Sequence, residues 1–93
     1  PEHPVPDHKH QDAFKRMRQN EKRRIRNRTH RSRMRTEIKK LREAIEAGDS
    51  KTAAVQLPLT VSMIHRVAQK GIIHRKQAAR RVSRLSRAVQ ALG

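Results

Sequence analysis

Apolar side chains recur at helical spacing in the middle of the chain. The stripe follows the spacing i, i+4, i+7 and i+11 and comprises Met34, Ile38, Leu41 and Ile45. This spacing places the side chains on one face of a helix, which can pack on other helices. No Gly or Pro occurs between Phe14 and Ala47, so the sequence predicts one helix over about 14–47 that ends at Gly48.

Two further helices are predicted by the same kind of pattern. The first spans about 50–70, with Ser50 as N-cap and Gly71 as the stop, and its apolar stripe is Leu57, Val61, Ile64 and Ala68. The second spans about 75–92, and its stripe is Ala78, Val82, Leu85, Val89 and Leu92. Pro58 removes an amide donor, so we expect the middle helix to kink there or to begin nearby.

The three stripes and the lack of any strand pattern predict an all-α fold, a three-helix bundle formed by residues 13–93 as a single domain.

The first half of the long helix does not share the apolar face. Followed backwards, the stripe becomes polar at Arg31, Asn27, Arg24 and Asn20. We therefore expect this half to project from the bundle as a basic rod. Residues 1–12 hold three of the four prolines and are predicted to form an extended or disordered lead.

Charge indicates what this rod binds. The chain carries 24 Lys and Arg against 8 Asp and Glu, a formal charge of +16 and a pI near 11.9. Residues 15–42 contain fourteen of the basic residues, distributed around the helix, against Glu21 and Glu37 alone. Such a charge disfavours compact folding and favours a polyanionic partner, above all nucleic acid.

The rest of the composition narrows the function. Phe14 is the sole aromatic residue, which favours recognition of duplex backbone over stacking with unpaired bases. The chain has no cysteine and offers no Gly-rich phosphate loop, so we expect no enzymatic activity and no cofactor. Metal-capable side chains gather only in the lead, without a scaffold to hold them, and we expect no metal site there: His3, Asp7, His8, His10 and Asp12.

A membrane role is disfavoured for two reasons. The longest apolar run, 53–55, is far too short to span a bilayer, and residues 15–33 supply only Met17 and Ile25 for an amphipathic face. Three acidic residues in the first dozen also argue against a secretory signal or a transit peptide. We therefore expect the protein to stay in the compartment where it is made.

At residues 18–24, Arg-Gln-Asn-Glu-Lys-Arg-Arg, the chain resembles the family of bacterial ribosomal small-subunit protein twenty. The similarity continues through shorter matches at Ser32, 35–36, 38–40, Ala44 and 47–49, and it returns at 70–75 and 78–85. It implies a structural constituent of the small ribosomal subunit that binds 16S-type ribosomal RNA directly. It also implies contact with the 5′ domain and the long penultimate RNA helix at the base of the body, a role in ribosome assembly, no homo-oligomer and a cytoplasmic, ribosome-bound location. The sequence does not distinguish a bacterial from a plastid ribosome.

The resemblance also implies RNA-contacting residues. In the long helix they are Arg16, Arg18, Lys22, Arg23, Arg24, Arg26, Asn27, Arg28, Arg31, Ser32, Arg33 and Arg35. Around the third helix they are His74, Arg75, Lys76, Arg80, Arg81, Ser83, Arg84 and Arg87.

Four residues depart from the family pattern. The family has Lys-Asn where this chain has Arg75-Lys76, so any capping role of that Asn is lost or moved. Pro58 and His65 are unusual for the middle helix. At His74 two interpretations stay open, because an imidazole there can donate to a phosphate or simply fill the turn.

The main alternative is a DNA-binding basic helix. Asn20 and Arg28, like Asn27 and Arg35, share a spacing found in basic-region zippers. A zipper also needs leucine-type heptads sustained over several turns, whereas Gly48 follows soon after Leu41. The pattern therefore favours RNA.

Overall fold

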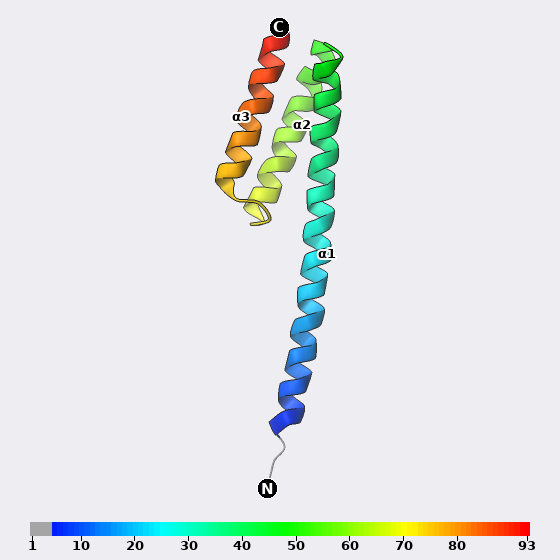
Figure 1. Ribbon diagram of the computed structural model, residues 1–93, viewed down its shortest axis with the longest axis vertical. Coiled ribbons are helices and arrows are strands. Elements are labelled where there is room, and N and C mark those ends of the chain that lie inside the picture. The colour runs from blue at the N-terminus through cyan, green and yellow to red at the C-terminus, as the bar shows by residue number, and fades with distance from the viewer. Residues whose placement is uncertain (1–4) are drawn as a thin grey trace.

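A computed structural model of the protein describes the backbone of residues 5–93 and the side chains from Asp12 onward. It contains three helices and no strand within these residues: α1 spans Val5–Glu46, α2 Ser50–Gln69 and α3 Arg75–Leu92. The predicted all-α, three-helix class is confirmed. The molecule is elongated, 77 × 20 × 15 Å, because α1 extends far beyond its two partners (Figure 1).

The order of the helices in space places α2 between the other two. The chain turns back after α1, so α2 runs antiparallel to it, and α3 returns in the direction of α1 (Figure 1). Helix α2 packs on both neighbours, whereas α1 and α3 contact each other only slightly. Both short helices lie against the C-terminal half of α1, and its N-terminal half projects alone (Figure 1).

The core is a thin seam between the helices. It comprises Met34, Ile38, Leu41, Ala44, Ala53, Ile64, Val67, Ala78 and Leu85. The predicted stripes of α1 and α3 all lie in or against this seam. In α2, Ile64 is the fully buried member of the predicted stripe, and the buried face is instead Ala53, Thr60, Ile64 and Val67. The face differs because α2 must bury side chains toward two neighbours at once.

The prediction of an extended segment over residues 1–12 is wrong for residues 5–12, because α1 already begins at Val5 rather than near Phe14. Pro6 stands in the first turn, where the missing amide would have had no helical partner, so a proline is tolerated there. Residues 1–4 lie outside the described residues, as do the side chains of Asp7, His8 and His10 from the possible metal-ligand set.

Helix α1 ends as predicted, at a glycine. Gly48 has φ +70°, its amide donates to Ile45 O at 3.0 Å, and the amide of Asp49 donates to Ala44 O at 2.9 Å. This pair of bonds satisfies carbonyls that the helix end leaves free. Gly71 ends α2 in the same way, with φ +76°.

The start of α2 differs from the prediction in its cap. The helix does begin at Ser50, but the capping side chain is Asp49, which accepts from the Thr52 amide at 3.1 Å and from the Thr52 hydroxyl. These hydrogen bonds lower the pKa of the Asp49 carboxyl, with the hydroxyl of Thr52 contributing most.

Helix α2 continues unbroken through Pro58. The proline removes the donor that would bond the carbonyl of Ala54, and both residues are exposed. Water can therefore take the place of the missing amide. The alternative that the helix begins near Pro58 is wrong.

Candidate nucleic-acid interface

The projecting half of α1 presents its side chains to solvent on all sides. Every residue from Asp12 to Arg26 is exposed, including Phe14, Met17 and Ile25. Among the described residues of this half, one ion pair forms, between Arg24 and Glu21 at 2.8 Å. The remaining basic side chains therefore face solvent without a partner carboxylate in this part of the structure.

The first set of predicted contact residues lies along this surface and its continuation. Eleven are exposed and Asn27 is half-buried. The division of α1 into a packed half and an open half follows from the change in its apolar stripe, since Met34 is 2% exposed whereas Arg31 and Arg24, farther back on the same face, are exposed.

Near the end of α2, the structure adds residues that the sequence does not connect. Lys70 lines a shallow hollow with Arg23, Arg26, Asn27 and His30 of α1. Lys70 and His30 were not among the predicted contacts. Nothing in the local sequence links Lys70 to Arg23, because their proximity depends on the antiparallel return of α2.

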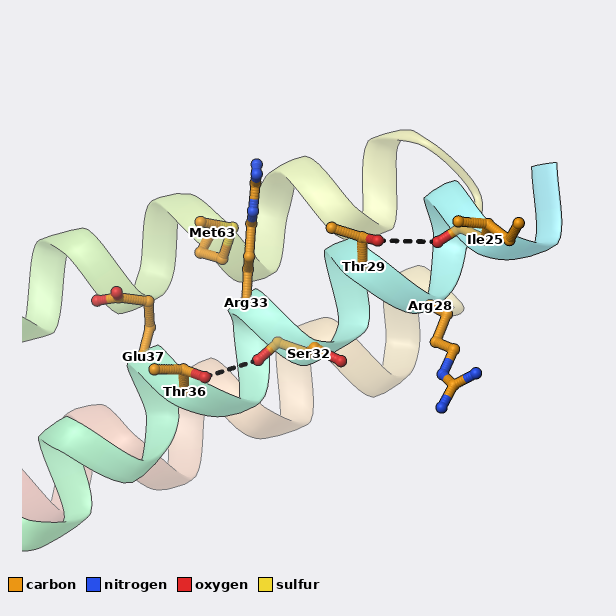
Figure 2. A pocket seen from close by; sticks show the side chains of 8 residues that line it. All are labelled: Ile25, Arg28, Thr29, Ser32, Arg33, Thr36, Glu37 and Met63. Carbon is orange, nitrogen blue, oxygen red and sulfur yellow. Dashed lines mark hydrogen bonds between the residues drawn. The ribbon is translucent and has the colours of Figure 1, made fainter. Parts of the chain in front are cut away.

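A groove between α1 and α2 gathers three predicted residues, Arg28, Ser32 and Arg33, with Met63 of α2 (Figure 2). The hydroxyls of Thr29 and Thr36 also line it. Figure 2 shows Arg28 and Arg33 leaving α1 in opposite directions, Arg33 on the side of Met63 and Arg28 away from it.

Both threonine hydroxyls of this groove donate to their own helix. Thr29 donates to Ile25 O and Thr36 to Ser32 O, each at 2.9 Å, as Figure 2 shows. Ile25, Thr29, Ser32 and Thr36 repeat the i, i+4, i+7, i+11 spacing of the core stripe. This second stripe was the signal in the sequence that could have identified the groove.

The second predicted set begins at the N-terminus of α3. His74 caps this helix, since its Nδ1 accepts from the Lys76 amide at 3.1 Å. His74 thus caps α3 in a chain that has Lys76 where the family pattern has an Asn. A nitrogen that accepts from an amide carries no hydrogen, which leaves Nε2 as the donor of the neutral ring.

The rest of this set divides into two groups. Arg80, Arg81 and Arg84 line a groove that faces α1. Arg75, Lys76 and Arg87 are exposed outside that groove, and Ser83 is half-buried.

Other kinds of site find no support in the described part of the chain. No group of three His, Asp or Glu side chains is placed to hold a metal ion there. No helix within the same residues is long and apolar enough to cross a membrane.

The fold and this surface define a small all-α binding protein that carries its positive charge on exposed helices. A family model described as "Ribosomal protein S20" matches residues 8–90. The chain therefore belongs to the ribosomal protein S20 family, as a structural ribosomal protein without enzymatic activity.

Named relatives agree with this assignment. The protein called small ribosomal subunit protein bS20 of Trichlorobacter lovleyi is 45% identical over 84 residues, which cover 90% of this chain and 97% of the relative. The protein of the same name from Persephonella marina is 52% identical over 85% of this chain and 86% of the relative. That of Nitrosomonas eutropha is 53% identical over 87% and 93%, respectively.

Proposed function

We propose that this protein is a constituent of the small ribosomal subunit that binds 16S-type ribosomal RNA directly and braces separate RNA helices during assembly. The observation that carries the proposal is the projecting half of α1, which is basic on all sides and extends beyond α2 and α3 (Figure 1). The name of the relatives, small ribosomal subunit protein, supports the choice of partner.

The mechanism follows from charge. RNA helices repel one another through their phosphates, and a rod with arginines on every side neutralises phosphates in more than one direction. Arginine forks suit phosphate oxygens because they donate two parallel hydrogen bonds. A protein with one aromatic residue, Phe14, has little to stack against bases, so recognition rests on backbone and shape.

Within the subunit, we place the protein at the base of the body, against the 5′ domain and the long penultimate helix. This placement rests on the family resemblance, as do the two sets of contact residues and the cytoplasmic ribosome as its location. We treat residues 13–93 as one RNA-binding domain that acts as a single copy.

The DNA-binding alternative is disfavoured by the end of α1. The apolar stripe of α1 is buried within the same chain by α2 and α3, and the helix itself ends at Glu46. A basic-region zipper needs that stripe to face a second chain.

The first test is where the tagged protein sediments in a cell lysate and which RNA it carries. We expect it to move with small ribosomal subunits and to recover their RNA. Recovery of genomic DNA from a slowly sedimenting pool would reject the proposal.

A second test separates binding from folding. The triple variant Arg23→Ala, Arg24→Ala and Arg28→Ala should weaken binding to a small-subunit RNA fragment on the order of a hundredfold, because three phosphate contacts are lost. The bundle should stay folded, since these side chains are exposed.

The matched control for this variant removes the same charge elsewhere. Lys39, Lys51 and Arg66 are exposed and lie outside both predicted sets. Their triple alanine variant should keep most of the RNA affinity. Equal losses in the two variants would show that net charge alone, and not the projecting helix, determines binding.

A further inference from the structure

A groove separates α1 from α3 on the side where these two helices contact each other only slightly. Its apolar residues are Ile38 of α1 and Leu85 of α3, both part of the core. Gln77 and four arginines complete the lining: Arg42 from α1 and Arg80, Arg81 and Arg84 from α3. The groove holds about 300 Å³, which is room for a phosphodiester group.

The lining is positively charged without a counter-charge. No carboxylate lines the groove, and the ion pairs of the described side chains lie elsewhere, at Arg24 and Lys40. Arg80 and Arg84 stand at i, i+4 on one helix, a spacing at which like charges repel. Arg42 adds a fourth guanidinium from the opposite helix, so repulsion acts across the groove as well as along α3.

One donor in this groove lacks an acceptor. The Nε of Arg81 is buried from solvent and has no hydrogen-bond partner among the described residues. A buried polar group without a partner is destabilising, and a charged one more so. In this conformation the atom is shielded from water, so the side chain of Arg81 has to shift before a molecule that enters the groove can provide an acceptor.

We infer that this groove clamps a phosphate group of RNA between α1 and α3. The inference rests on the RNA-binding function proposed above and deepens it, because it gives one phosphate a defined place. It also assigns a phosphate contact to Arg42, which lies outside both sets taken from the family resemblance. An anion among the four guanidinium groups gives these side chains, including that of Arg81, an acceptor and reduces the repulsion across the groove.

The clamp has a consequence for folding. Because α3 is held mainly by α2, the groove is the open side of the bundle. An anion bound by Arg42 on one side and by Arg81 on the other joins α1 to α3 directly. Phosphate should therefore stabilise the folded bundle, and binding RNA should tighten the packing of α3.

The first measurement compares thermal unfolding of the full chain in inorganic pyrophosphate and in chloride at equal ionic strength. We expect pyrophosphate to raise the melting temperature by about 5 °C or more. Arg42→Met and Arg81→Met should each abolish this gain. In chloride, Arg81→Met should melt no lower than the wild type, since it removes a buried donor that has no acceptor.

Arg66→Met is the matched control, because Arg66 is an exposed arginine of α2 that does not line the groove. It removes the same charge and should keep the gain in melting temperature. The inference is overturned when the wild type shows no gain, or when the gain survives in Arg42→Met. Since Arg42 is itself exposed, this variant remains informative even where Arg81→Met folds poorly.

The second measurement distinguishes RNA phosphate from a free anion. Binding of a small-subunit RNA fragment is followed across salt concentrations, and Arg42→Met should reduce the log–log slope by about one, whereas Arg66→Met leaves it unchanged. A lost pyrophosphate gain with an unchanged slope means that the groove holds free anions only, which overturns the inference. Absence of RNA binding by the wild type would instead reject the proposed function.

Discussion

At the scale of single residues, the contact between α1 and α2 depends on one buried hydroxyl. Thr60 is fully buried, and its Oγ1 accepts from Gln56 Nε2 at 3.2 Å. The same oxygen lies 3.2 Å from Glu37 O and 3.1 Å from Gln56 O, to either of which it can donate. The Gln56 amide also donates to the Glu37 carboxylate. The apolar pattern of α2 could not predict that Thr60 is buried, because threonine counts as a polar residue in such a pattern.

Thr60→Val tests the value of that hydroxyl. Valine keeps the volume, but it leaves the Gln56 amide without one acceptor, so we expect a loss of about 1–2 kcal/mol in the free energy of unfolding. Chemical denaturation measures the change. Ser62→Ala, at an exposed position of α2, is the control, and a Thr60→Val effect no larger than that of the control would contradict the argument.

The carboxylate of Asp49 makes the stability of the fold depend on pH in the acidic range. Its folded-state pKa lies below the ordinary value of 3.8 because Thr52 donates to the carboxylate. A lowered pKa means that the carboxylate stabilises the fold above the unfolded-state pKa, and that this contribution is lost as the pH falls through the folded-state pKa. Asp49→Asn should therefore flatten the fall in melting temperature between neutral pH and about pH 2, while Asn still caps α2.

The control for this prediction is Glu43→Gln, which changes an exposed carboxylate in the interior of α1, away from the cap of α2. It should leave the acid dependence close to that of the wild type. An Asp49→Asn curve that parallels the wild type would show that the cap does not depend on the charge of Asp49.

At the scale of the elements, the sequence predicted the ends of helices better than the start of α1. Gly48 and Gly71 stop α1 and α2 because a glycine readily takes the positive φ that each turn requires. The start at Val5 was missed because proline usually interrupts a helix, although Pro6 fits a first turn. Local chemistry thus determines where these helices stop, whereas a proline near an end allows either outcome.

Pro58 should weaken the helix that holds the bundle together. Pro58→Ala restores an amide donor to Ala54 O and removes the clash of the ring, but it also gives the unfolded chain more freedom. We expect a net gain of about 1–2 kcal/mol in the free energy of unfolding. Thermal unfolding measures the gain, and Ser62→Ala again serves as control. A loss of stability would show that the proline ring makes packing contacts that outweigh its cost.

At the scale of the whole molecule, charge and hydrophobic pattern predicted which half of α1 packs and which half projects. The predicted contact residues of α1, apart from Asn27, are exposed because most of them lie in the half that projects. The hollow lined by Lys70 and Arg23 and the groove lined by Arg42 and Arg81 were not predictable, because they form only where the helices return on one another. The apolar pattern of a helix shows which of its faces is buried, but it does not show which residues of another helix lie across from that face.

The same charges give salt two opposite effects, which form the last prediction. In the free protein, like charges such as Arg24 and Arg28 stand at i, i+4 on the projecting helix, so added salt should screen them and raise the helical signal.

In the complex, salt competes with the protein for phosphates. If about ten phosphates are neutralised, the log–log slope of RNA affinity against salt should be on the order of −7 to −9. Circular dichroism of the free chain and a binding titration over the same salt series measure the two effects. A shallow slope would contradict charge neutralisation, and a helical signal that falls with salt would contradict the repulsion along α1.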